Sequence, residues 1–235
     1  MSVELVASSQ CLLVRRISKG SVFVLQLAAV KPLPNKGVKP LRPIQYRVIM
    51  EFSIPWQNLN IEDIQYGNAQ SNTRIENGFF VPIYFADKHV RCQAFHLLSP
   101  ELTIQEIETT RDGVFIILKI PKTTDFGKKL KAFDERNLQN AEECRKEWFS
   151  TDKPEQTITY KTALKNLPNG DLEWRLQIPD SGVFSCYDSS RKGWYGSNES
   201  GLVNRKWKIL ARTSGLWIID SSFGMDWKLI GAFAS

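Results

Sequence analysis

Cysteine and histidine are scarce in this chain, and neither residue forms a pattern that binds a metal. The 235 residues include four cysteines and two histidines. No two cysteines have the short spacing of a zinc site, so we expect no metal and no other cofactor. Free thiols in a reducing compartment are the expectation for the cysteines, although an even number also permits disulfides.

Catalytic and membrane-spanning signatures are missing as well. The sequence has no phosphate-binding P-loop, no His-Glu-x-x-His zinc motif and no Gly-x-Ser-x-Gly nucleophile motif. The longest apolar run, residues 22–30, has about half the length that a membrane helix needs. The first residues lack the layout of a secretory signal. We therefore expect a non-enzymatic, cytoplasmic protein without a membrane partner, although an active site built from carboxylates would leave no local signature.

The charge balance is modestly basic. Lysine and arginine number 31 against 25 acidic residues, which gives a formal net charge of +6. This excess favours a polyanionic partner such as nucleic acid, but it also occurs in proteins that have none. The hydrophobic fraction of 42% is ordinary for a globular protein, so the chain can bury a core without metals or disulfides.

Alternation of apolar and polar residues predicts a strand-rich fold. The clearest strand is residues 44–54, where Ile49 alone breaks the alternation. Two earlier stretches, joined by a turn at Gly20, indicate a hairpin. A second hairpin is expected from residues 157–164 and 171–178. Further strands are predicted at residues 79–85, 90–98, 114–120, 206–212, 216–220 and 227–233.

One amphipathic helix is expected at about residues 124–148. Its apolar residues, Phe126, Leu130 and Phe133 among them, recur at spacings of three and four, and Thr124 or Asp125 can cap its start. Strands do not alternate regularly with helices, which argues against a parallel α/β sheet. We predict a mainly β fold (β-rich α+β), an antiparallel sandwich or barrel with this helix. It forms one domain over residues 1–235, or two halves at residues 1–122 and 123–235.

A proline-rich basic segment, residues 31–43, joins two predicted strands. It contains Lys31, Lys36, Lys39 and Arg42, and it has no acidic residue. Proline stiffens such a connection, and a stiff cationic loop suits contact with a phosphate backbone. A solvated loop, or docking on another protein subunit, would have the same composition.

A second candidate segment, residues 181–202, combines aromatic and basic residues in a Ser/Gly-rich stretch. Arg191 and Lys192 lie directly beside Trp194 and Tyr195. Exposed aromatics next to cations stack on unpaired bases, so single-stranded nucleic acid is favoured over duplex. Packing against the core, and contact with sugar rings or with a protein, are the alternatives.

The strand at residues 206–212 separates its residue types by face. Lys206, Lys208 and Arg212 share one face, whereas Trp207 and Ile209 share the other. We therefore expect Trp207 in the core and the three cations in solvent. Three lysines near the helix start, Lys128, Lys129 and Lys131, are expected to form a solvated face.

These patterns together predict a nucleic-acid-binding protein, or the accessory subunit of a nucleoprotein complex with other protein partners. Basic loops would contact the phosphates of DNA or RNA. One alternative is a structural β-sandwich subunit of a virion, a tail or another assembly. A second alternative is a carbohydrate-binding module, which rests on Trp194 and Tyr195.

Overall fold

In the computed structural model, the described part of the chain forms two packed β-sheets and two α-helices. The structure describes residues 4–8, 11–15, 22–27, 48–72, 78–87, 91–149, 157–179, 184–187, 193–195 and 201–234. Helices α1 (Asp125–Glu143) and α2 (Arg145–Phe149) accompany many strands. The predicted β-rich α+β class is therefore confirmed.

Five strands of the larger sheet close into a ring. The hydrogen-bonded order is β9–β10–β13–β19–β16, and β16 pairs back onto β9. Every pairing in the ring is antiparallel except that of β13 with β19. Alternate side chains point inward and are buried, as Leu118 and Trp174 are. The ring is thus a filled barrel. Its strands are β9 (His96–Thr110), β10 (Gly113–Ile120), β13 (Leu172–Gln177), β16 (Lys206–Arg212) and β19 (Lys228–Ala234).

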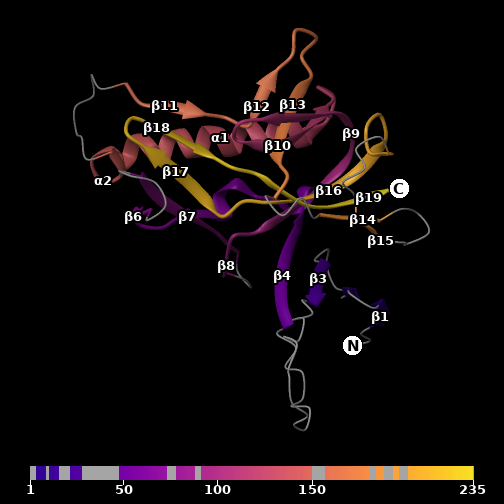
Figure 1. The fold of residues 1–235 in the computed structure, drawn as a ribbon. Coiled ribbons are helices and arrows are strands. Elements are labelled where there is room, and N and C mark those ends of the chain that lie inside the picture. The colour runs from indigo at the N-terminus through magenta and orange to yellow at the C-terminus, as the bar shows by residue number, and fades with distance from the viewer. Residues whose placement is uncertain are drawn as a thin grey trace, which may run out of the picture.

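Further strands extend the larger sheet on both sides of the barrel. Strands β1 to β4 pair in sequence, and β4 joins β9 in parallel. In Figure 1 this arm runs away from the helices. The predicted first hairpin is confirmed as β2–β3. The added strands are β1 (Glu4–Ser8), β2 (Cys11–Arg15), β3 (Val22–Leu27), β4 (Val48–Pro55), β12 (Leu164–Asn166), β14 (Ser185–Tyr187) and β15 (Gly193–Tyr195).

The second sheet is built around β7. Its order is β11–β18–β17–β7–β5, and β6 and β8 also pair with β7. Two short 3-10 turns, η1 (Trp56–Asn58) and η2 (Ile61–Asp63), precede it in the chain. Its strands are β5 (Ile64–Tyr66), β6 (Gln70–Ser71), β7 (Gly78–Ala86), β8 (Arg91–Gln93), β11 (Thr159–Lys161), β17 (Gly215–Ile219) and β18 (Ser222–Met225).

Helix α1 joins the barrel to the second sheet through its predicted apolar face. Phe126 packs edge-on against Trp174 of the barrel, with ring centroids 5.5 Å apart. Phe133 packs in the same way on Trp227, at 6.0 Å. Figure 1 shows the helix running from the β12–β13 hairpin towards β18 and α2. The two sheets therefore share one aromatic core.

A buried polar cluster fixes α1 against the second sheet. Asn137, which is fully buried, accepts a hydrogen bond from the Tyr66 hydroxyl at 2.7 Å and donates one to Tyr160 at 2.9 Å. The Tyr160 hydroxyl donates in turn to Asp134, which also accepts from Thr162. Burial raises the pKa of both tyrosines, so their hydroxyl groups remain protonated donors.

The structure departs from the predicted elements at three places. The expected continuous helix is interrupted at Cys144, between α1 and α2. The expected strand at residues 90–98 is divided, because Ala94 has a positive φ of 56° and lies between β8 and β9. Residues 159–161 were expected to pair with β13, but they form β11 and pair in parallel with β18, so that β12 alone completes the predicted hairpin.

Candidate nucleic-acid interface

The predicted basic face of β16 is present. Lys206, Lys208 and Arg212 are exposed, whereas Trp207 and Ile209 are 4% and 0% exposed. The Trp207 indole nitrogen also donates to the Leu202 carbonyl at 3.0 Å, which fixes the ring in the core. The alternation seen in the sequence therefore gave the correct face for each of these residues.

A fourth cation, Lys228 on β19, lies beside this face. Backbone register places Arg212 directly opposite Lys228, and both residues are exposed. Like charges in directly opposite positions destabilise a sheet. We call Lys206, Lys208, Arg212 and Lys228 the basic row. Within the residues that the structure describes, no member of the row makes an ion pair. Exposed Glu101 on β9 lies opposite Lys208 in the backbone register, so the row has a net positive charge with one acidic neighbour.

Cations on the neighbouring outer face of the barrel are largely neutralised. Five residues lie directly opposite one another on five successive strands. In order across the sheet they are Lys206, Thr103, Lys119, Glu173 and Lys165. Lys119 lies 2.9 Å from the carboxylate of Asp171, and Lys165 lies 3.1 Å from that of Glu173. The unneutralised positive charge of this surface therefore lies mainly in the basic row.

Asp171 fixes the end of this face. A hydrogen bond from the Lys122 backbone N–H, assisted by the Lys119 ammonium, lowers the pKa of its carboxyl group. Asn169 also donates to this carboxylate, at 2.9 Å. The ionised Asp171 carboxylate is therefore held in place where β10 and β13 meet their connecting loops.

A stacked pair occupies the other end of the same face. The guanidinium carbon of Arg175 on β13 lies 3.7 Å from the centre of the Phe115 ring on β10. One guanidinium nitrogen also lies 3.2 Å from Glu108, and the Arg175 side chain is 41% exposed. The Nε atom of Arg175 has no hydrogen-bond partner among the described residues. Because the Nε atom is itself buried, the face presents only the flat guanidinium plane, which is partly neutralised by Glu108.

Sequence reasoning missed Lys228, Phe115 and Arg175. Each lies on a strand that was predicted, but a strand prediction does not give the register between strands. Phe115 and Arg175 are 60 positions apart in the chain and meet because β10 pairs with β13. The available signal was the clean alternation of residues 171–178, which places Arg175 on the outward face; the mostly apolar residues 114–120 give no such signal for Phe115.

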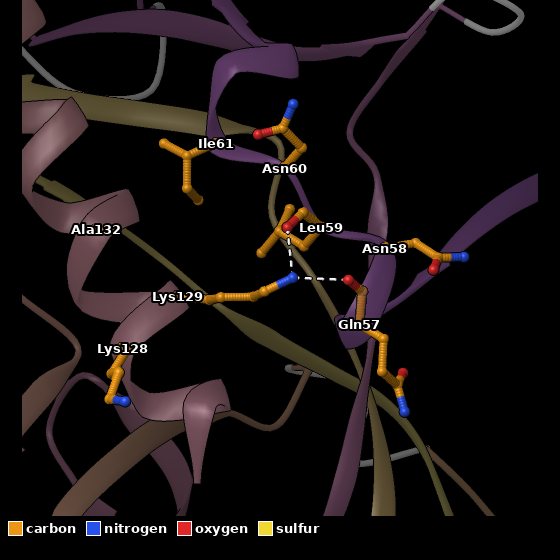
Figure 2. Close-up of a pocket in the computed structure, with 8 residues that line it drawn as sticks. All are labelled: Gln57, Asn58, Leu59, Asn60, Ile61, Lys128, Lys129 and Ala132. Atoms are coloured by element: carbon orange, nitrogen blue, oxygen red, sulfur yellow. Dashed lines mark hydrogen bonds between the residues drawn. The ribbon is translucent and has the colours of Figure 1, made fainter.

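The predicted solvated face at the helix start is wrong for Lys129, which makes structural contacts, whereas Lys128 and Lys131 are exposed. The Lys129 ammonium donates to the carbonyls of Trp56, Gln57 and Leu59 at 3.2, 2.7 and 2.8 Å. Figure 2 shows this side chain reaching across a hollow of about 450 Å³ between α1 and η1. Lys128 pairs with Asp125 at 2.9 Å. Because both ammonium groups already have partners, this hollow is a weak candidate for an anion site.

The other predicted site residues are covered incompletely. Lys31, Lys36, Lys39 and Arg42 lie outside the described residues, and so do Arg191 and Lys192. Trp194 and Tyr195 belong to β15, whose backbone pairs with Ser185 and Cys186 of β14. Part of the predicted loop is therefore a hairpin attached to β19.

The described part of the chain offers no cluster of metal ligands. It contains no group of three or more histidine, cysteine or acidic side chains that could hold a metal ion. None of the helices there combines the length and the hydropathy needed to cross a bilayer. Cys92, Cys144 and Cys186 are free thiols.

The strand order of the barrel identifies its architecture. If the five strands are numbered by their order in the chain, their order around the barrel is 1-2-3-5-4, and strand 4 pairs back onto strand 1. Strands 3 and 5 are parallel. This is the connectivity of the OB-fold, a small five-stranded Greek-key barrel. Helix α1 lies in the connection between the second and third strands.

Comparisons with known proteins give structural neighbours, which include two single-stranded DNA-binding proteins. No family model matches this chain, and no curated protein matches it in sequence. One solved structure with similarity is gp2.5, a single-stranded DNA-binding protein encoded by bacteriophage T7. It shares 11% identity over 60% of this chain and 86% of its own, with a TM-score of 0.40. The second is the single-stranded DNA-binding protein from bacteriophage Enc34, solved in complex with single-stranded DNA. It shares 13% identity over 73% of this chain and 95% of its own, with a TM-score of 0.38.

Proposed function

We propose that this protein binds single-stranded nucleic acid without catalysing a reaction. The basic row contacts the phosphates, and the outer face of β10 and β13 contacts the bases. The observation that carries the proposal is the pairing of Arg212 with Lys228, two exposed cations in directly opposite positions. Repulsion between these two cations lowers the stability of the free protein. A phosphate bound between them would remove that repulsion.

The barrel supports this proposal through its architecture. In OB-fold barrels the face of the second and third strands, with the adjoining loops, binds oligonucleotides and oligosaccharides. In this chain that face carries the Arg175–Phe115 stack. Bases of single strands stack on aromatic rings and on guanidinium planes. Base pairing in a duplex buries those surfaces, so the stack favours a single strand.

The proposal retains the contacts expected from the sequence. The lysines and the arginine of residues 31–43 would follow the phosphate backbone, and Arg191 and Lys192 would flank a base stacked on Trp194 or Tyr195. The protein would act within a nucleoprotein complex, where further protein subunits bind the same strand.

The first experiment is a fluorescence-anisotropy titration of labelled single-stranded DNA, single-stranded RNA and duplex at several salt concentrations. Single strands should bind more tightly than duplex, and the affinity should fall as salt rises. The variant Lys206→Gln with Lys208→Gln should reduce the log–log salt slope by about 1.4, because each phosphate contact contributes about 0.7 for a single strand.

A matched control is Lys131→Gln with Lys146→Gln, which removes two exposed charges from the helices. The control should leave the slope nearly unchanged. If both double variants weaken binding equally, the attraction is a net-charge effect and the basic row is not the site. An absence of binding to every probe at low salt would overturn the proposed function.

A further inference from the structure

The outer face of the second sheet carries three partly exposed aromatic rings. Phe80 and Tyr84 lie on β7, and Trp217 lies on β17 directly opposite Phe80. Their neighbours in sequence, such as Val81 and Leu216, point to the other side and are fully buried. The three rings are half-buried. We call Phe80, Tyr84 and Trp217 the aromatic face.

Each ring of the aromatic face lies against a glycine of a neighbouring strand or turn. A Cβ atom added at Gly224 would lie 2.6 Å from the Trp217 ring, and one at Gly215 would lie 2.5 Å from the Phe80 ring. At Gly67 the corresponding distance to the Tyr84 ring is 3.1 Å. Rings so close to bare backbone lie low across the sheet. They therefore form a broad aromatic surface and do not interdigitate with a covering layer.

The surroundings of the aromatic face are polar, with a cation at each end and one acid, Asp226, which accepts a hydrogen bond from the Trp217 indole nitrogen at 3.0 Å. The Arg91 guanidinium lies 5.1 Å from the centre of the Tyr84 ring. At the other end, exposed Lys161 pairs in register with Gly224, next to Trp217. Three exposed glutamines lie opposite the rings, Gln70 beside Phe80 and Gln65 and Gln93 beside Tyr84. Amide groups in such positions can bond to base edges, and the cations can contact phosphates.

The aromatic face follows the basic row in the chain. Arg212 ends β16, and Gly215, against which Phe80 lies, is three residues later. Three extended residues span on the order of 10 Å. Hairpin β17–β18 is itself the connection between barrel strands β16 and β19. A nucleic-acid strand bound along the basic row would therefore end within one or two nucleotide lengths of the β17–β18 hairpin.

We infer that the aromatic face is a second contact surface for single-stranded nucleic acid, where bases stack on Trp217, Phe80 and Tyr84. This inference rests on the proposed function and extends it from the barrel to the second sheet. The cations at both ends, Arg91 and Lys161, favour an anionic polymer over a neutral glycan. A strand long enough to leave the barrel reaches this face, whereas a short one does not.

The test compares two lengths of single-stranded DNA. A single OB-fold barrel covers about 4–16 nucleotides, so probes of about 8 and about 30 nucleotides separate one surface from two. Trp217→Leu with Tyr84→Leu should weaken binding of the long probe by about 5- to 150-fold per lost stack. The same variant should bind the short probe like the wild type, which also shows that the barrel is folded.

A second variant avoids any change to packing. Arg91→Gln with Lys161→Gln leaves the rings in place and should lower the salt slope for the long probe alone, by about 1.4. The double variant Lys206→Gln with Lys208→Gln should weaken both probes. This contrast separates the aromatic face from the basic row.

Three results would overturn the inference. If both aromatic-face variants bind the long probe as the wild type does, the second surface does not exist, while the proposed function stands. If the wild type binds neither probe at low salt, the proposed function fails and the inference fails with it. If Trp217→Leu abolishes binding to a neutral glycan or dissociates a dimer in sedimentation, without affecting the long probe, the face serves that ligand instead.

Discussion

Arg212 and Lys228 occupy directly opposite positions on two antiparallel strands, and both side chains reach solvent. Replacing Lys228 by glutamate creates an opposite-charge pair, which should stabilise the folded protein by roughly 0.2–1 kcal/mol. The same change places a negative charge in the proposed phosphate track. We therefore expect Lys228→Glu to raise the melting temperature and to lower the affinity for single-stranded DNA. Thermal unfolding and anisotropy titration measure the two effects.

Lys228→Gln provides the control for that trade-off. It removes the repulsion without adding a negative charge, so its affinity should lie between those of wild type and Lys228→Glu. If Lys228→Glu binds single-stranded DNA as tightly as the wild type, Lys228 does not contact the strand.

The Arg175–Phe115 stack predicts a loss of binding without a loss of structure. Arg175→Ala removes the guanidinium plane from the barrel face. Loss of one base stack costs about 1–3 kcal/mol, so we expect the dissociation constant for a short single strand to rise about 5- to 150-fold. Leu138→Ala, an exposed apolar residue on α1, is the control and should bind normally. Equal affinities of Arg175→Ala and wild type would exclude stacking at this position.

Asp171 makes part of the stability depend on pH. Because its pKa is lowered in the folded protein, its stabilising contribution is fully present above the unfolded value of about 3.9. That contribution is lost as the pH falls through the folded-state pKa. Asp171→Asn should therefore melt at a lower temperature than the wild type at pH 7. The difference in melting temperature between the two proteins should shrink in acid. A difference that stays constant from pH 7 down to pH 3 would argue against this role.

The buried amide of Asn137 predicts a stability effect that is independent of nucleic acid. Asn137→Ala leaves the Tyr66 hydroxyl without its acceptor in the core, which should cost about 1–3 kcal/mol. Urea unfolding measures the change. Gln139→Ala, on the exposed side of the same helix, should differ from the wild type by less than about 0.5 kcal/mol. A similar cost for both variants would assign the effect to the helix and not to the hydrogen bonds.

Local periodicity predicted the burial of most residues in β16. The exception is Leu210, which alternation places with the lysines but which is only 4% exposed, next to irregularities in the pairing of β16 with both neighbouring strands. Alternation along a strand is decided by backbone geometry alone, so Trp207 could be placed in the core and Lys208 in solvent. The same reasoning placed Phe126 and Phe133 on the buried face of α1. These features depend on residues close together in the chain.

Register between strands could not be predicted in this way. The approach of Lys228 to Arg212 depends on the hairpin β17–β18 that separates their strands, and its second strand was not expected. Short strands such as Ser222–Met225, which includes a glycine, have too little alternation to be recognised. The aromatic face was missed for the same reason, because it is assembled from β7 and β17 across more than 130 residues.

Interruptions of a predicted strand and of the predicted helix, at places without glycine or proline, were also missed. Ala94 adopts a left-handed conformation that alanine seldom takes, so nothing local marks the end of β8. The division of the helix at Cys144 has no proline or glycine either. Neither interruption has a local sequence signal, so neither could be predicted from the sequence alone.

The barrel draws β9 and β10 from the chain before α1, and β13, β16 and β19 from the chain after it. A cut on either side of the helix therefore leaves two fragments, each with strand edges that the other fragment covers in the intact protein. Truncation mapping would report loss of binding whichever fragment was kept, and open edges would promote aggregation. The two fragments should instead complement each other when they are produced together, and binding should return when the ring closes.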